Sequence, residues 1–260
     1  MRSSVSIETL ETLELERRGH VWIVRLNRPS KMNAMSPRMF SELQLVMGSA
    51  SDDWSVHAIV LTGSGKAFSA GADINTFEKL QDDAEYHAQL ATVEAAFRAV
   101  EDCAVPVIAA VNGPALAGGL EILLFCDFVL AVDVATFGFS EILVGLQPVY
   151  GLSRGSANAG RNWIRYLAYT GESLSASTAL SIGIVQKVLP TTHSLMMEAM
   201  RIANRIAALP TSAVREGKRL EAELARVADL SLTIAPATRL FADKKHKEAV
   251  QSFLRQRRSR

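Results

Sequence analysis

Short apolar runs separated by longer helical stretches constrain the fold of this chain most. The runs AIVLTG (58–63), VPVIAAVNG (105–113) and FVLAV (128–132) are rich in β-branched residues, and the first two end at glycines. Strands that are apolar on both faces are typical of a sheet that is covered on both sides. A helical stretch over residues 82–102 lies between the first two runs. The alternation of strand and helix therefore predicts an α/β layer fold around a buried sheet.

The two ends of the chain add elements of a different kind. LELE, the turn at Arg18-Gly19 and HVWIVRL predict an opening β-hairpin. Ser36 and Pro37 are typical of the N-cap and first position of a helix. After about Ala157 the chain changes character, with helix-like stretches at residues 157–170, 175–182, 194–208, 212–229 and 237–255. We therefore expect an α/β core followed by a helical C-terminal portion.

Composition and charge narrow the class of protein. Hydrophobic residues make up 48% of the 260 residues and charged residues 21%, which is typical of a globular protein. A formal net charge of +1 argues against a nucleic-acid binder, although a few local cations could still hold one small polyanion. The two cysteines, Cys103 and Cys126, lack a CxxC spacing, and the five histidines lack metal-ligand spacing.

The apolar stretches and the first residues of the chain indicate in which compartment the protein is expected. The longest of them are too short and too broken to span a bilayer. The first residues, MRSSVSIETLETLELE, lack the apolar region of a signal peptide. We therefore expect a cytoplasmic protein with no membrane partner, no nucleic-acid partner and no metal site.

Two loops that follow predicted strands are rich in small residues. GSGKAFSAGADI (63–74) leaves the first apolar strand, and VNGPALAGGLEI (111–122) leaves the second and enters a helix. Small residues let backbone N–H groups approach a ligand closely, and a helix start adds positive potential. Two such loops at adjacent strand ends would form an oxyanion hole, a pair of main-chain donors for a developing negative charge. Either loop alone is better explained as a tight turn.

Two glutamates lie where a charge is otherwise unfavourable. Glu121 follows the second loop in the run LEILLFCDFVLAV, and Glu141 lies in FGFSEILVGLQP, again between apolar residues. One such glutamate could face solvent at an edge. Two of them beside a candidate oxyanion hole form a plausible acid–base pair, because apolar surroundings raise a carboxyl pKa toward neutrality.

A serine hydrolase is a competing hypothesis. GLSRG (151–155) matches the G-x-S-x-G nucleophile elbow, with Ser153 as nucleophile and Asp229 and His246 downstream. That elbow needs a strand directly before it, and residues 145–150 resemble a loop instead. A glycine-bearing surface loop is therefore the favoured interpretation of this segment.

The motifs together resemble the crotonase, or enoyl-CoA hydratase/isomerase, superfamily. The segments that carry the resemblance are LNRPSKMNAMS (26–36), KAFSAGADI (66–74), NGPALAGGLEILLFCD (112–127), FGFSEILVGLQP (137–148) and GESLSASTALSIGIVQKVLP (171–190). The resemblance implies a spiral core of ββα units over residues 1–190. It also implies a C-terminal helical region over residues 191–260 that mediates trimerisation. The assembly would be a homotrimer, or a homohexamer built as a dimer of trimers.

The resemblance assigns roles to residues of both loops. The oxyanion donors fall on the backbone N–H groups of Ala72 and Gly118, and the backbone carbonyl of Ala70 falls where the family binds adenine. Lys66 is a candidate cation for the coenzyme A phosphates. Three neighbours complete the implied coenzyme A site: Asp73, Ile74 and Asn75.

The resemblance also implies a reaction. Glu121 and Glu141 fall on the two catalytic glutamates of the hydratases, so the implied enzyme is a hydro-lyase that hydrates an enoyl-CoA. Coenzyme A is then part of the substrate, and no cofactor or metal is expected. The alternatives are an isomerase that uses Glu141 alone and a non-catalytic acyl-CoA-binding protein.

The chain departs from the hydratase pattern at two places. Val149 and Tyr150 stand where the hydratases have a glycine-rich turn, which leaves the acyl-chain preference open. Asn75 stands where a lysine often helps to bind phosphate. The cations that could compensate are Lys244, Lys245, Arg257 and Arg258.

Overall fold

A six-stranded sheet forms the centre of the computed structural model, which describes residues 7–77, 80–225, 241 and 244–258. Its strands lie in the order β1 (Leu13–Arg18), β2 (Val21–Leu26), β3 (Ala58–Gly63), β4 (Val107–Val111), β6 (Phe128–Val132) and β9 (Lys187–Leu189). Strand β1 is antiparallel to β2, and every other neighbouring pair is parallel. The predicted hairpin and the three predicted apolar strands are thus confirmed, and so is the α/β class.

A second, three-stranded sheet joins the two glycine-containing loops. It consists of β5 (Ala115–Leu116), β7 (Thr136–Gly138) and β8 (Ser173–Ser175), in the order β5-β7-β8. Isolated bridges link Ser69 to Ala115 and Met35 to Ala72. Segments that follow β2, β3 and β4 therefore meet at one place.

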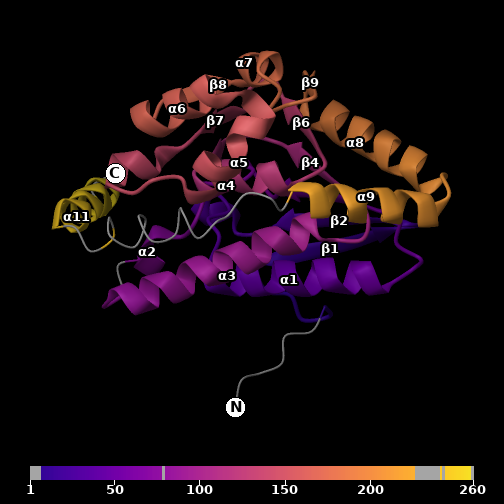
Figure 1. Cartoon of the computed structure of the whole chain (residues 1–260), viewed down its shortest axis with the longest axis horizontal. Helices are drawn as coiled ribbons and strands as arrows, with labels where there is room; N and C mark the ends of the chain where they lie inside the picture. Colours follow the sequence, from indigo (N-terminus) through magenta and orange to yellow (C-terminus); the bar gives the residue numbers. More distant parts are fainter. Residues whose placement is uncertain (1–6, 78–79, 226–240, 242–243, 259–260) are drawn as a thin grey trace.

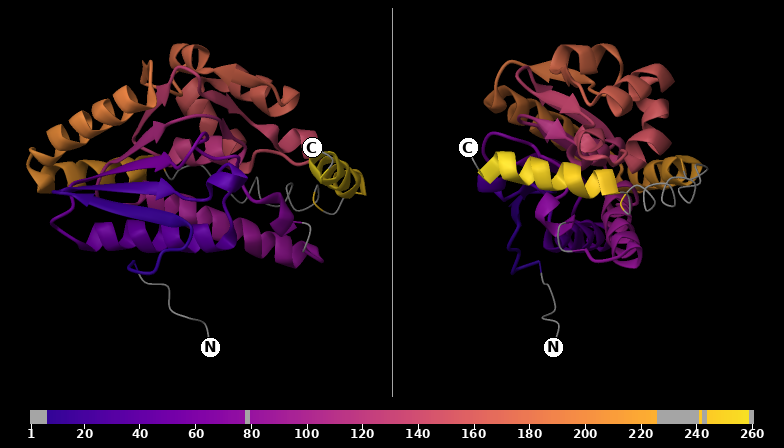
Figure 2. Two further views of the ribbon diagram at one scale, coloured as in Figure 1. Left: turned by 180° about the vertical axis from the view of Figure 1, so that it is seen from behind. Right: turned by 90° about the vertical axis from the view of Figure 1, so that its left-hand side faces the viewer.

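Helices surround the sheets in the part of the chain that the structure describes. They are α1 (Pro37–Asp52), α2 (Ile74–Phe77), α3 (Asp83–Glu101), α4 (Gly118–Glu121), α5 (Val149–Ala159), α6 (Arg161–Thr170), α7 (Ala176–Ser181), α8 (Thr192–Ala207), α9 (Thr211–Ala225) and α11 (Lys244–Arg258). Three 3-10 turns accompany them, η1 (Pro29–Lys31), η2 (Ile122–Phe125) and η3 (Ser140–Val144). Helices α1 and α3 lie side by side, and α8 packs on the central sheet (Figure 1). Helix α11 lies at the end of the molecule opposite the α8–α9 turn (Figure 2).

The N-terminus of α1 matches its sequence signature. The Ser36 hydroxyl accepts a hydrogen bond from the Met39 amide at 3.3 Å, and Pro37 occupies the first helical position. A proline fits there because its missing N–H would have no partner inside the helix.

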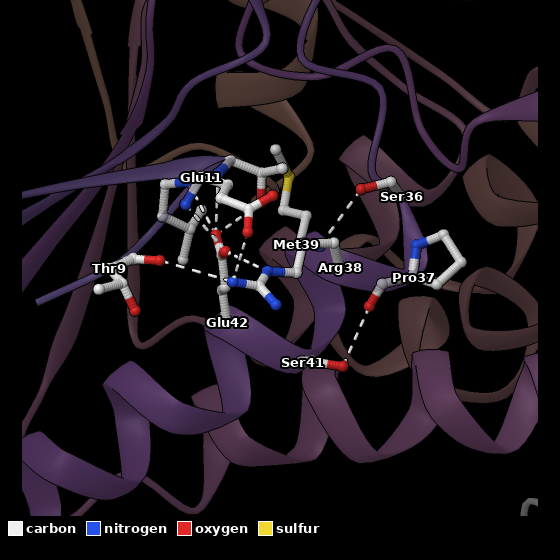
Figure 3. A network of polar contacts seen from close by, with 10 residues as sticks. Thr9, Glu11, Ser36, Pro37, Arg38, Met39, Ser41 and Glu42 are labelled. Atoms are coloured by element: carbon white, nitrogen blue, oxygen red, sulfur yellow. Dashed lines mark hydrogen bonds and ion pairs between the residues drawn. The ribbon is translucent and has the colours of Figure 1, made fainter. Parts of the chain in front are cut away.

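A buried glutamate fastens the first strand to α1 (Figure 3). The Glu42 carboxylate is fully buried and accepts hydrogen bonds from the amides of Glu11, Thr12 and Leu13 at 2.9–3.1 Å. Arg38, one turn earlier on α1, forms an ion pair with the same carboxylate at 2.7 Å. These donors outweigh the cost of burial, so the pKa of Glu42 lies below its usual value.

The C-terminal half differs from the prediction in detail. GLSRG (151–155), interpreted as a surface loop, lies inside α5, so that interpretation is wrong. The stretch at 157–170 contains the end of α5 and all of α6, with Gly160 between them at φ +74°. The predicted helices at 212–229 and 237–255 extend in part beyond the described residues. No helix among the described residues is long and apolar enough to cross a membrane.

Candidate active site

An apolar cavity of about 410 Å³ lies beside the second sheet. Helices α1, α3, α5 and α11 and the turn η3 supply about half of its wall, through side chains such as Phe40, Leu90, Val149, Val250 and Leu143. Both predicted glutamates line it, and so do Ala70, Ala72, Ile74 and Gly118. The structure therefore brings together the predicted donors and the predicted acid–base pair.

The two loops approach each other closely at the cavity. A Cβ atom added to Gly118 would lie 3.5 Å from the amide nitrogen of Ala72, and one added to Gly71 would lie 3.0 Å from the amide nitrogen of Gly118. Gly71 adopts φ +91°, which L-residues rarely adopt. Neither the Ala72 nor the Gly118 amide donates a hydrogen bond to a described residue. The two N–H groups are thus neighbours that lack a protein acceptor in the described part.

The helix expected after the second loop is short. Helix α4 begins at Gly118, inside the predicted loop segment, and becomes the 3-10 turn η2 at Ile122. Its preceding residue, Ala117, has φ +50°, which is unusual for a residue with a Cβ. Four residues of α-helix carry little dipole, so the donors at this place are individual amides.

Glu121 is buried and serves as the N-terminal cap of α5. Its Oε1 accepts hydrogen bonds from the amides of Tyr150 at 2.8 Å and Gly151 at 3.0 Å. Burial raises the pKa of this carboxyl, and the two amides partly oppose that rise. The carboxyl is therefore easier to protonate near neutral pH than an exposed glutamate.

Glu141 lies on η3 and also has a raised pKa. Burial is the main cause, and the charge of Glu121 adds to it. Its Oε2 atom is buried and has no hydrogen-bond partner among the described residues. A buried carboxyl oxygen without a partner is costly, and a ligand or water in the cavity is the natural acceptor or donor for it.

Two further cavity residues are not among the predicted site residues. Tyr86 of α3 is 2% exposed, and its pKa is raised by burial and by the charges of Glu121 and Glu141. The Lys31 side chain is 49% exposed and lines the same cavity. Tyr86 lies in an ordinary amphipathic helix. Lys31 lies in the turn η1, within the segment 26–36 that carries the family resemblance, but only the tertiary structure places its side chain at the cavity.

Three predicted coenzyme A residues do not line the cavity. Lys66 is exposed in the loop after β3. Asp73 forms an ion pair with Arg28 at 2.9 Å, and its other carboxyl oxygen accepts a hydrogen bond from the Asn75 side chain at 2.7 Å. Asp73 and Asn75 thus organise the start of α2. The side chains of Lys244, Lys245, Arg257 and Arg258 lie outside the described part.

The serine-hydrolase hypothesis lacks its geometry. Ser153 lies in the second turn of α5, and its hydroxyl donates to the Val149 carbonyl at 3.0 Å. It does not line the cavity, and no strand leads into it. Asp229 and the side chain of His246 lie outside the described residues. A nucleophile elbow is therefore absent from residues 145–159.

Sequence comparisons place the chain among known enzymes. The family model for enoyl-CoA hydratase/isomerase matches residues 16–260. The short-chain-enoyl-CoA hydratase of Clostridium acetobutylicum is 34% identical over 267 residues, which cover 96% of this chain and 97% of that protein. The crotonyl-CoA hydratase of Syntrophomonas wolfei is 35% identical over 254 residues, with the same coverage of 96% and 97%.

Comparison with solved structures indicates the same family. An enoyl-CoA hydratase/isomerase from Mycobacterium paratuberculosis superimposes with a TM-score of 0.85 at 27% identity, covering 93% of this chain and 98% of that one. An enoyl-CoA hydratase from Mycobacterium smegmatis gives a TM-score of 0.80 at 32% identity, covering 95% and 97%. The fold and the cavity define the class, an α/β protein with two glutamates at one apolar cavity. Within that class, the chain belongs to the enoyl-CoA hydratase/isomerase family, which confirms the resemblance found in the sequence.

Proposed function

We propose that the protein adds water across the double bond of an α,β-unsaturated acyl-CoA thioester and releases a 3-hydroxyacyl-CoA. The observation that carries this proposal is a pair of buried carboxyls at one cavity, each with a raised pKa. When one carboxyl is protonated and the other ionised, the pair can act as acid and base in a single addition. Relatives named as enoyl-CoA and crotonyl-CoA hydratases support the same reaction.

The two glutamates divide the proton transfers. Ionised Glu121 orients the water and accepts its proton as the water oxygen bonds to Cβ of the thioester. Protonated Glu141 contacts the same water and delivers a proton to Cα. One proton leaves the water and one reaches the substrate, so the charge of the carboxyl pair is unchanged. General acid–base catalysis of this kind contributes about 10²–10⁴-fold to the rate.

The thioester oxygen gains negative charge during this addition. The amides of Ala72 and Gly118 would donate to that oxygen, since they are neighbours without an acceptor among the described residues. Loss of one such donor lowers kcat by about 10²–10³-fold in enzymes that use them.

Coenzyme A binding is the least constrained part of the proposal. Ala70 and Ile74 line the cavity and would contact the bound thioester, and half-exposed Lys31 adds a cation at the same wall. Lys66, Asp73 and Asn75 stay predictions as binding residues. Asn75 acts first on Asp73, so its contribution to phosphate binding would be indirect.

Double-bond isomerisation is the second candidate. The observation that favours it is an asymmetry between the glutamates: Glu121 Oε1 accepts two amide hydrogen bonds, whereas Glu141 Oε2 has no described partner. An isomerase would use Glu141 alone to move an allylic proton. Glu121 would then serve only to cap α5.

The purified protein should hydrate crotonyl-CoA, followed as loss of absorbance of the conjugated thioester. Glu141→Gln should lower kcat by about 10²–10⁴-fold, and Glu121→Gln should act similarly, because each removes one proton carrier. Glu198→Gln, on α8 and paired with Lys187 and Arg201, is the matched control and should retain full activity.

Two outcomes would contradict this proposal. Hydration that persists in the Glu121→Gln/Glu141→Gln double variant would exclude the carboxyl pair as its source. If the wild-type protein does not hydrate crotonyl-CoA, and both it and Glu121→Gln turn over a 3-enoyl-CoA, the isomerase is correct.

Assembly, cofactor use and location belong to the same proposal. We expect no separate cofactor or metal, because the proposed chemistry uses side chains, amides and the thioester alone. A homotrimer or a homohexamer follows from the family resemblance. A cytoplasmic location is supported by Cys103 and Cys126, which are both unpaired.

A further inference from the structure

We infer that the Tyr150 side chain limits the length of the acyl group, which makes short-chain enoyl-CoA thioesters the substrate class. This inference rests on the proposed function, because it places the acyl group in the cavity beside Glu121. It concerns the side chain alone. The backbone amide at position 150, which holds Glu121, is kept by every residue except proline.

Tyr150 bridges the wall between the glutamate and α3. Its amide donates to Glu121 Oε1 at 2.8 Å, and its hydroxyl donates to the carbonyl oxygen of Leu90 at 3.1 Å. The ring therefore extends from the Glu121 carboxyl to α3. Both Tyr150 and Leu90 line the cavity. An acyl chain whose Cβ lies at Glu121 meets this ring a few atoms further on.

The ring is held so that it cannot move aside easily. Tyr150 is 1% exposed, and its ring packs edge-on against Phe97 and Phe125 at centroid distances of 5.4 and 5.8 Å. The guanidinium of Arg154 covers Phe125 at 4.3 Å from its centroid. Arg154 in turn pairs with Glu101 of α3, with one contact at 2.8 Å. The aromatic cluster of Tyr150, Phe97 and Phe125 connects α5 to α3, and the Arg154–Glu101 ion pair does the same. Displacing the Tyr150 ring would therefore disturb both helices.

The remaining wall reinforces the limit. Phe40 and Phe97 are fully buried and Tyr86 is 2% exposed, so aromatic side chains line the cavity around Tyr150. Closely packed aromatic side chains adapt little to a longer chain, so they reinforce the limit that the Tyr150 ring sets. The structure thus assigns the end of the acyl site to one side chain, which a single substitution can remove.

Calorimetric binding of saturated thioesters tests this without turnover. The wild-type protein should bind butanoyl-CoA and lose at least tenfold in affinity for dodecanoyl-CoA. Tyr150→Leu should bind longer thioesters more tightly than butanoyl-CoA. Its affinity for octanoyl-CoA should exceed its affinity for butanoyl-CoA by at least tenfold, since each newly buried methylene raises the affinity by up to about fourfold. Tyr150→Phe removes only the hydroxyl and should keep the wild-type order.

Folding of the variants is checked by their melting curves. Tyr150→Met keeps apolar volume in a flexible side chain and should relax the limit even if Tyr150→Leu does not fold. The inference fails if wild-type protein binds dodecanoyl-CoA as tightly as butanoyl-CoA. It also fails if a folded Tyr150→Leu or Tyr150→Met keeps the wild-type order. A length limit in binding without hydration of crotonyl-CoA would refute the proposed function and leave this inference intact.

Discussion

At the scale of single residues, the two cavity glutamates act against stability. Burial raises the pKa of both, so each carboxyl is less acidic in the folded chain than in the unfolded one. Below the unfolded pKa both states hold the proton and the shift has no effect. As the pH rises toward the folded pKa, the unfolded state releases the proton more readily and the folded state loses stability. Two carboxyls in an apolar cavity therefore cost stability, and the proposed acid–base function is what would offset that cost.

Glu141→Gln should consequently raise Tm, and the gain should be larger at pH 8 than at pH 5. We expect an increase of about 2–4 °C for each kcal/mol recovered. Thermal unfolding at both pH values measures it. Glu198, on α8, is partly buried, and its pKa is lowered to about 2 by Arg201 and Lys187, so Glu198→Gln should not give this gain. A Tm change for Glu141→Gln that is equal at both pH values would contradict the raised pKa.

At the scale of elements, the limits of sequence-based prediction are clearest at α5. The apolar runs at 58–63 and 128–132 predicted β3 and β6 with their bounds, because burial on both faces leaves a local pattern. Helix α5 was predicted as a loop, since Pro148, Gly151 and Gly155 are turn-forming residues. Its amides are capped by Glu121, which lies 29 residues earlier than Tyr150. A cap that comes from a residue so distant in the sequence leaves no pattern in the residues of the helix itself.

The residues of the candidate site also fall into two groups, those that a local sequence pattern reveals and those that only the tertiary structure reveals. Glu121 and Glu141 could be found because a charge interrupts an apolar run. The two loops could be found because small residues follow strands, and the family resemblance then assigned Ala72 and Gly118 within them. Tyr86 of α3 could not be found in this way, since its neighbours form an ordinary helix. Tyr86 lies beside the glutamates because α3 packs against η2 and lines the cavity.

Gly119→Ala tests the contact between the two loops. A Cβ at Gly119 would overlap the carbonyl oxygen of Ser69, so the loops that carry the Ala72 and Gly118 amides must separate. We expect a lower Tm and a loss of kcat of about 10²-fold or more, comparable to loss of an oxyanion donor.

Gly48→Ala is the matched control for that substitution. Gly48 lies in α1, and a Cβ there would have nothing within 4 Å. Alanine should stabilise this helix by about 0.5–1 kcal/mol and leave the catalytic rate unchanged. Wild-type activity in Gly119→Ala would show that the loops tolerate separation and that the donors are not where we place them.

At the scale of the whole molecule, the C-terminal region also supports the core. Helix α8 begins at Thr192, yet its residues Leu195, Ala199 and Ala203 are buried in the main hydrophobic core. From α9, Arg215 donates to the carbonyl of Ser51 at 2.7 Å, and Lys218 forms an ion pair with Asp127 at 2.6 Å. Helix α8 therefore covers the sheet of its own chain. The predicted boundary between core and assembly region at residue 190 stays a prediction.

Truncation separates these two roles. A chain ending at residue 190 should lack cooperative unfolding, because removal of α8 exposes the apolar face of β2, β3, β4 and β6. A chain ending at residue 225 retains α8 and α9 and should melt cooperatively. If residues beyond 225 hold the trimer together, light scattering should give the mass of a single subunit for this shorter chain and at least three times 28.2 kDa for the full chain. A soluble, cooperatively folded 1–190 chain would instead place the structural boundary at 190, and an unchanged number of subunits for 1–225 would place the assembly contacts within the retained elements.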